Sequence, residues 1–381
     1  MAQTFADICV RGGGIVGCTA ALALAQQRLS VALVLPAAVA PAGAAPDIRA
    51  YALNAASRAL LEGLRAWPDE AATPVARMQV HGDGGGEIGF DAATQGVAAL
   101  AWIVDVPALE ARLMQALSFQ PLVTVVDAPP PKAALTVICE GKASRSREAL
   151  AVQWQSQPCG QHAIACRIRA ERSHGDVARQ WFGADGSILA FLPLRDGPAS
   201  ADGHGCAVVW SVDSAQGPEL MALPDEAFAA RLGQASHHGL GEVALAQGAR
   251  AAWPLQNARA SHFAGTGPQG AWVLAGDAAH AVHPLAGQGL NLGLGDVAEL
   301  AAQLQGREYW RGPGDERVLR RYERARRAAS LAMTRSMAGL QELFAHPAPL
   351  SRELRNRGLS LVDRLPLAKQ WLARAAIAPI S

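Results

Sequence analysis

The stretch AWVLAGDAAHAVHPLAGQGLNLG, residues 271–293, predicts a strand, a loop and a helix in direct succession. Residues 272–274 form a short apolar run suited to a buried parallel strand, Gly276 and Asp277 end it, and an apolar helical segment opens at Gly287. A helix start has unpaired backbone N–H groups and the positive end of the helix dipole, and glycine lets a ligand approach closely. The stretch therefore predicts a site for an anion or an electron-rich ring, with Asp277 placed to accept hydrogen bonds from a polyol chain.

A second glycine-rich loop lies near the N-terminus, where residues 12–17 read GGGIVG. It follows a short apolar strand and precedes a helix-like segment, so Gly12, Gly14 and Gly17 form a G-x-G-x-x-G motif in dinucleotide-binding context. The first glycine permits the tight turn, the second admits a pyrophosphate, and the third lets the helix pack closely on the strand. One such motif alone is weak evidence, but the two glycine loops together indicate a bound dinucleotide.

Both loops resemble those of the FAD-dependent aromatic hydroxylases, and within them the ubiquinone-biosynthesis hydroxylases. The pattern of that family, GDAAH-x-x-HP-x-x-GQG-x-N-x-G, matches residues 276–293 position by position. The resemblance implies FAD as cofactor, with Asp277 on the ribityl chain and the helix start facing the flavin pyrimidine. The cofactor-binding residues that it implies are Gly12, Gly14, Gly17, Arg49, Glu140, Gly276, Asp277, Pro284, Gly287, Gly289, Leu290 and Asn291. It names no catalytic side chain, only the flavin-facing loop with Pro284, Gly287, Gln288 and Gly289.

Two further segments resemble the family and contain departures from its pattern. Residues 47–54, DIRAYALN, resemble its D-x-R-x-x-A-L block and place Arg49 near the flavin, and residues 137–145 resemble its second nucleotide motif. Glu140 replaces the usual aspartate there, and Pro107 stands where the family has a basic residue. The second strand ends at Leu35, without the carboxylate that normally binds the ribose; such a loss weakens binding by about 1.5 to 3 kcal/mol.

The resemblance implies a monooxygenase that uses O2 and NAD(P)H to hydroxylate an aromatic, phenolic and prenylated ring. No second G-x-G-x-x-G domain is evident, as expected if NAD(P)H is a transient reductant without its own domain. The glycines at 82–86 are better explained by a hairpin turn, because no apolar helix follows them. Two alternatives stay open. Because of the three departures, the chain is also compatible with a flavin-poor, non-catalytic subunit of a biosynthetic assembly. It is also compatible with a hydroxylase of a small soluble aromatic compound.

Composition favours a soluble, cytoplasmic protein. The chain has 381 residues, a net charge of +1 and 50% hydrophobic residues, which indicates two connected domains and gives no electrostatic case for nucleic acid. The N-terminus lacks the pattern of a secretory signal, and no credible membrane span is present. The cysteines have no C-x-x-C spacing, so we expect reduced thiols and no metal site; they are Cys9, Cys18, Cys139, Cys159, Cys166 and Cys206.

Periodicity predicts an α/β fold with two discontinuous domains. Residues 1–75, 106–150 and 262–345 should form a Rossmann-like FAD-binding domain. Residues 76–105 and 151–261 should form a substrate-binding domain on a mostly antiparallel β-sheet. Its expected strands lie at 78–80, 101–104, 151–155, 163–170, 178–182, 188–192 and 207–212. We expect packing in or on this sheet rather than stacking on substrate for each of Trp181, Trp210 and Trp253, with the alternative that one or two of them line a hydrophobic pocket.

The final segment, 346–381, is expected to be helical. Between residues 352 and 378 it combines six basic residues with an apolar stripe. Such a helix either lies on an anionic membrane surface, which suggests peripheral contact with the inner membrane or with a biosynthetic complex, or packs on the nucleotide domain. In the glycine loop, His280 and His283 are expected to position Pro284 rather than to act in catalysis.

Overall fold

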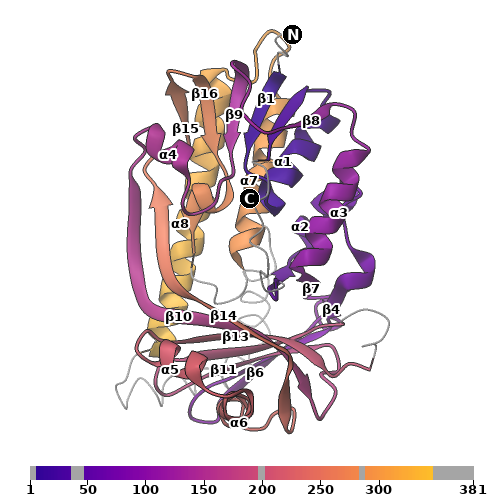
Figure 1. The fold of residues 1–381 in the computed structure, drawn as a ribbon, viewed down its shortest axis with the longest axis vertical. Coiled ribbons are helices and arrows are strands. Elements are labelled where there is room, and N and C mark those ends of the chain that lie inside the picture. The colour runs from indigo at the N-terminus through magenta and orange to yellow at the C-terminus, as the bar shows by residue number, and fades with distance from the viewer. Residues whose placement is uncertain (1–5, 36–46, 196–201, 283–287, 346–381) are drawn as a thin grey trace.

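The computed structural model describes residues 6–35, 47–195, 202–282 and 288–345, and Figure 1 shows the fold. It has the α/β architecture that the sequence predicts, with six-, eight- and three-stranded sheets. The expected residues Pro284, Gly287 and His283, and the segment 346–381, lie outside the described residues. Within the described ranges, no helix is long and apolar enough to cross a membrane. All six cysteines have free thiols.

The six-stranded sheet has the order β15-β16-β9-β1-β2-β8 and is parallel except for the β15–β16 pair. Its strands are β1 (Ala6–Arg11), β2 (Val31–Val34), β8 (Val123–Val126), β9 (Ala133–Ile138), β15 (Ala264–Gly267) and β16 (Gly270–Leu274). Its central strands are almost continuously apolar, as burial on both faces requires. They share one core with α1 (Ile15–Gln26), α3 (Val106–Ser118), α7 (Gln288–Gln305) and α8 (Glu316–Ala345).

The eight-stranded sheet lies at the other end of the molecule (Figure 1) and has the order β17-β14-β10-β13-β12-β11-β5-β6. Only its β5–β11 pair is parallel. Its strands are β5 (Arg77–His81), β6 (Glu87–Asp91), β10 (Trp154–Ala170), β11 (Val177–Phe182), β12 (Ile188–Pro193), β13 (Gly205–Asp213), β14 (Val243–Ala260) and β17 (His280–Ala281). The helices α5 (Gln216–Ala222) and α6 (Asp225–Ala235) cover one face and bury Trp181 and Trp210, which confirms that these two tryptophans pack in the core.

The strand that we expected at 101–104 in the large sheet was assigned to the wrong sheet. It forms β7 (Ala101–Asp105), which pairs with β3 (Ala50–Leu53) and β4 (Ala72–Val75) in the three-stranded sheet. The reason is that β7 faces two cores: Trp102 and Val104 pack with the six-stranded sheet, whereas Ile103 packs against the large sheet. The three-stranded sheet therefore joins the two larger sheets.

The strands expected at 151–155 and 163–170 are one long strand, β10. Register shifts near residues 158–162 and 166–168 mark irregularities in its pairing with β14, and such bulges bend a strand and increase its twist. In Figure 1, β10 and β14 run from the side of the six-stranded sheet, curve, and enter the large sheet. The division into two domains at the expected boundaries stays a prediction. Four short elements complete the fold, namely α2 (Ala55–Gly63), α4 (Arg145–Ala149) and two 3-10 turns, η1 (Asp69–Ala71) and η3 (Gly276–Ala278).

Candidate cofactor and substrate site

The N-terminal glycine loop joins β1 to α1, and each of its three motif glycines has a distinct structural reason. Gly12 has a φ of +115°, and a Cβ there would overlap the Cys139 carbonyl oxygen. A Cβ at Gly17 would overlap the Gly12 carbonyl oxygen, so the helix and loop are in direct backbone contact. Gly14 has no atom within 4 Å of such a Cβ and is the N-cap of α1 without a side-chain cap. The loop thus leaves open space and uncapped N–H groups where a pyrophosphate would bind.

The second glycine motif lies against the first. Gly276, with a φ of +62°, begins the turn η3, and a Cβ there would lie 3.2 Å from Val16 Cγ2 in the first turn of α1. Asp277 is exposed although its neighbours in the turn are buried. Among the described residues, the Asp277 carboxylate has no hydrogen-bond or ion-pair partner. It is therefore free to accept hydrogen bonds from a ligand that spans the two motifs.

A buried ionic cluster supports this turn, and our sequence analysis did not find it. Asp296 of α7 accepts a hydrogen bond from the Gly276 N–H at 2.8 Å and pairs with His280 Nε2 at 2.7 Å and Arg326 Nε at 2.6 Å. Burial raises the pKa of Asp296, but its interactions with His280 and Arg326 outweigh burial and hold the pKa below its ordinary value. The only signal in the sequence is the single carboxylate, Asp296, in the otherwise uncharged run LNLGLGDVA. His280 is thus part of the buried ionic cluster that holds the Gly276 turn in place.

The start of α7 contains the expected flavin contacts Gly289, Leu290 and Asn291. The Asn291 amide donates to the Ala52 carbonyl at 2.8 Å, and its oxygen accepts from the Asn54 N–H at 3.0 Å. The Asn291 side chain therefore connects α7 to the β3–α2 junction. Leu290 is buried, whereas a Cβ at Gly289 would have no atom within 4 Å. Gln288 begins the helix.

A cavity of about 200 Å³ lies between the large sheet and the three-stranded sheet. Most of its lining is aliphatic, with Arg49, Tyr51 and Asn54 among its polar residues. Burial raises the pKa of Tyr51, the Arg49 guanidinium opposes this, and the Asp277 carboxylate adds to the rise. The Tyr51 part of the cavity therefore lies within electrostatic reach of the turn that contains Asp277. Arg49 itself is paired with Asp47 at 2.5 Å.

Comparison with known proteins decides what kind of protein combines these features. Residues 132–337 match the family model of the FAD binding domain. The chain belongs to the FAD-dependent monooxygenase family. It is 31% identical to 3-demethoxyubiquinol 3-hydroxylase of Escherichia coli, over 97% of this chain and 98% of that protein. It is 30% identical to ubiquinone hydroxylase UbiL of Rhodospirillum rubrum, over 99% of this chain and 90% of that protein.

Two solved structures have the same fold as this chain. The crystal structure of p-nitrophenol 4-monooxygenase PnpA from Pseudomonas putida has a TM-score of 0.73 at 18% identity, covering 98% of this chain and 97% of that chain. HpxO of Klebsiella pneumoniae, solved with FAD and uric acid, has a TM-score of 0.67 at 15% identity, covering 96% and 97%. The open, uncapped loop at Gly14 and the unpaired Asp277 fit FAD in this monooxygenase.

Two departures of this monooxygenase from the family pattern have visible structural consequences. Glu140 accepts hydrogen bonds from the Ser144 hydroxyl at 2.8 Å and the Ser146 hydroxyl at 2.6 Å, and it pairs with Arg11 Nε at 3.1 Å. These interactions outweigh burial and lower the pKa of Glu140. Its carboxylate is thus engaged with the loop before α4 and with Arg11. The Leu35 side chain covers Gly13, where an added Cβ would overlap Leu35 Cδ2.

The third departure, Pro107, has a local explanation. It lies in the first turn of α3, where a proline costs no hydrogen bond because the first N–H groups of a helix have no partner in the helix. The Asp105 side chain caps this helix by accepting from the Ala108 N–H at 3.2 Å. Pro107 therefore helps to begin α3.

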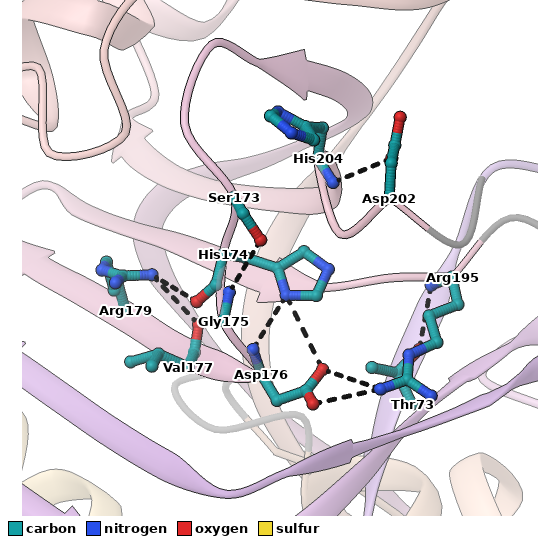
Figure 2. Close-up of polar contacts among 10 residues, drawn as sticks. All are labelled: Thr73, Ser173, His174, Gly175, Asp176, Val177, Arg179, Arg195, Asp202 and His204. Carbon is teal, nitrogen blue, oxygen red and sulfur yellow. Dashed lines mark hydrogen bonds and ion pairs between the residues drawn. The ribbon is translucent and has the colours of Figure 1, made fainter.

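A polar cluster fixes one edge of the cavity, and Figure 2 shows its contacts. The buried His174 accepts a hydrogen bond at Nδ1 from the Asp176 N–H at 3.0 Å, and burial lowers its pKa, so it stays neutral near pH 7. Asp176 pairs with Arg195 at 3.0 Å, and the Arg195 N–H donates to the Thr73 hydroxyl of β4 at 2.9 Å. The cavity-lining Arg179 donates to the His174 carbonyl at 3.1 Å. The cluster ties the large sheet to the three-stranded sheet.

Proposed function

We propose that this monooxygenase hydroxylates a phenolic ring that carries an apolar, prenyl-type tail, with O2 and NAD(P)H as co-substrates, as in ubiquinone biosynthesis. The observation that carries the proposal is the largely aliphatic cavity between the large sheet and the three-stranded sheet. Its chemistry complements a hydrocarbon tail better than a charged substrate. The full-length similarity to two hydroxylases named for ubiquinone chemistry supports the same substrate class.

In this proposal the residues of the chain bind and orient. The uncapped N–H groups at the start of α1 hold the pyrophosphate, and Asp277 accepts hydrogen bonds from the ribityl chain. The N–H groups at the start of α7, near Gly289 and Leu290, stabilise negative charge on the pyrimidine side of the ring. FAD, when bound, supplies the activation of O2 with electrons from NAD(P)H. The aliphatic cavity excludes water around the substrate ring.

A hydroxylase of a small aromatic acid is the first rival. It would need a cationic side chain free to meet a carboxylate. Arg49 is already paired with Asp47, and Arg179 donates to the backbone carbonyls of His174 and Val177. The two arginines that line the cavity are therefore engaged within the protein, which favours the apolar substrate.

A flavin-poor, non-catalytic subunit is the second rival, and a specific observation supports it. Leu35 covers the glycine loop, and the Glu140 carboxylate is bonded within the protein. Both residues stand where the family has a carboxylate that touches the cofactor. Titration of the purified protein with FAD distinguishes the two functions, because a subunit of this kind would bind no FAD even when FAD is in excess.

The decisive experiment is an activity assay. Protein with saturating FAD is incubated with NADH or NADPH and air, and with matched phenols that do or do not carry a geranyl tail. We expect mass spectrometry to detect one added oxygen on the geranylated phenol, with Asp277→Ala as the control that lowers FAD retention. Turnover of the untailed phenols alone would contradict the proposed substrate class.

A further inference from the structure

Two hydroxyl-bearing residues line the cavity, Tyr51 and Ser211, and the Ser211 hydroxyl has no hydrogen-bond partner among the described residues. We propose that Ser211 binds the hydroxyl group of the substrate ring, and that the ring is seated beside it on the alanines of the large sheet, against Trp253. This inference rests on the proposed function and names the residue that selects a phenol within the apolar cavity. None of these residues belongs to the two glycine motifs.

Strand alternation places Ser211 on the cavity face of β13. Its neighbours Trp210 and Val212 point to the opposite face, where they pack into the core beneath α5 and α6. Ala207, Val209 and Ser211 line the cavity. Because side chains alternate along a strand, Ser211 can reach the cavity but not that core.

The hydroxyl of Ser211 lies on the cavity wall, and no described residue forms a hydrogen bond with it. The residue is 4% exposed, yet in the part of the chain that the structure describes its hydroxyl has no hydrogen-bond partner. A polar group on a mostly apolar cavity wall is the kind of group that fixes the orientation of a bound ligand. A hydroxyl both donates and accepts, so it matches a phenol, which does the same.

The residues around Ser211 leave room for a flat ring. In the pairing register, Ala163 of β10 lies directly between Trp253 of β14 and Ser211 of β13, and Ile188 of β12 lies on the other side of Ser211. In the next row Ala165 and Ala190 flank Val209. Trp253, Ser211, Ile188, Ala165 and Ala190 all line the cavity. Small side chains thus form a recess, with an aromatic wall at Trp253 suited to ring contact.

The recess and the unpaired hydroxyl together identify the ligand chemistry. An apolar ring without an oxygen substituent would fill the recess but leave Ser211 without a partner. A phenol fills it and also completes the hydrogen bond, so the gain from Ser211 should appear only with the phenol.

A binding experiment with two probes tests this directly. The affinities of 2-geranylphenol and geranylbenzene are measured by calorimetry on protein with saturating FAD, for wild type, Ser211→Ala and Ser211→Thr. We expect Ser211→Ala to lower the affinity for 2-geranylphenol by roughly 2- to 12-fold, as for the loss of a neutral hydrogen bond, and to leave the affinity for geranylbenzene unchanged. Ser211→Thr keeps a hydroxyl and should keep the preference for the phenol. Ser156→Ala, an exposed serine on β10 bonded to Gln256, is the matched control.

The outcomes separate this inference from the proposed function. If wild type and Ser211→Ala bind both probes with equal affinities, the assignment of Ser211 is wrong although the apolar cavity still takes a prenylated ring. If Ser211→Ala weakens both probes to the same degree, Ser211 acts through packing and the hydrogen bond is refuted. If wild type binds neither probe, the proposed function itself fails.

Discussion

The carboxyl edge of the six-stranded sheet and the cavity face of the eight-stranded sheet are built from different parts of the chain. At the edge, glycines allow close backbone approach: Gly12 lies against the Cys139 backbone and Gly17 against the Gly12 backbone, while Gly276 lies against the Val16 side chain of α1. The cavity face consists instead of small side chains, such as Ala165 and Ala190, on paired strands. The edge is therefore determined by backbone geometry and the cavity by side-chain volume. Substitutions at the edge should change FAD binding or stability, whereas those on the cavity face should change only ligand binding.

The largest effect is expected beneath the edge, at Asp296. Asp296→Ala leaves Arg326 buried without its counter-charge, which should cost about 3 to 5 kcal/mol of unfolding free energy in urea titrations. The control is Glu316→Ala on α8, the helix that also contains Arg326. Glu316 pairs with Arg320, and both side chains are more than 70% exposed, so this variant should change stability little. Equal losses in the two variants would contradict the role given to the buried cluster.

The same cluster gives a pH dependence with a defined sign. The pKa of Asp296 is lowered in the folded protein, so its contribution to stability is complete above the unfolded value of about 4 and is lost as the pH falls through the folded value. Wild type should therefore lose more stability than Asp296→Asn when the pH is lowered below about 4. Parallel acid unfolding curves would show that Asp296 is not the group responsible.

The second prediction concerns the carboxylate that is missing from the edge. Leu35→Glu places an acceptor beside the glycine loop and should tighten FAD binding by about 10- to 150-fold, the range of a charge-assisted hydrogen bond of 1.5 to 3 kcal/mol. Leu35→Gln has the same length without the charge and should give a smaller gain. Fluorescence titration of FAD measures both, and unchanged affinity for Leu35→Glu would mean that the ribose lies elsewhere.

Two glycines of one motif give the third prediction. Gly17→Ala forces a Cβ onto the Gly12 carbonyl and should cost about 1 to 3 kcal/mol of stability as well as FAD binding. In Gly14→Ala the added methyl group points into open space, so the unfolding free energy should change by less than about 1 kcal/mol. FAD binding should still be weaker, because the methyl group occupies space that the ligand needs. Denaturation and FAD titration of both variants are the measurements. Wild-type FAD affinity in Gly14→Ala would show that the pyrophosphate does not bind at this loop.

The smallest effect on stability is expected on the cavity face. Ala190→Leu extends into the cavity and should change the unfolding free energy by less than about 1 kcal/mol, because the space is already present. FAD affinity should stay at the wild-type value while binding of 2-geranylphenol is lost. A parallel loss of FAD affinity would show that the carboxyl edge and the cavity face cannot be perturbed separately.

Much of this molecule could be predicted from its sequence because the signals are local. The glycine loop at 12–17 lies directly between β1 and α1, as predicted. The turn at 276–277 directly follows β16, but the two-residue strand β17 comes before α7, which begins at Gln288, and the local sequence did not indicate this strand. The burial of Trp181 and Trp210 follows from alternation within single strands. The roles of individual residues toward FAD, such as Arg49 and Glu140, remain predictions.

Other features were decided only by tertiary structure, because they join residues far apart in the chain. The sequence of β7 is compatible with either sheet, and its pairing was decided by two separate cores, one on each face. Asp296 and Arg326 lie on different helices, so nothing local marks them as partners. Ser211 is an ordinary serine in an apolar strand until pairing sets Ala163 beside it and places it on the cavity wall. The sequence by itself determined the strand–loop–helix units, since backbone conformation depends on near neighbours, whereas long-range packing decided which side chains meet in the cavity.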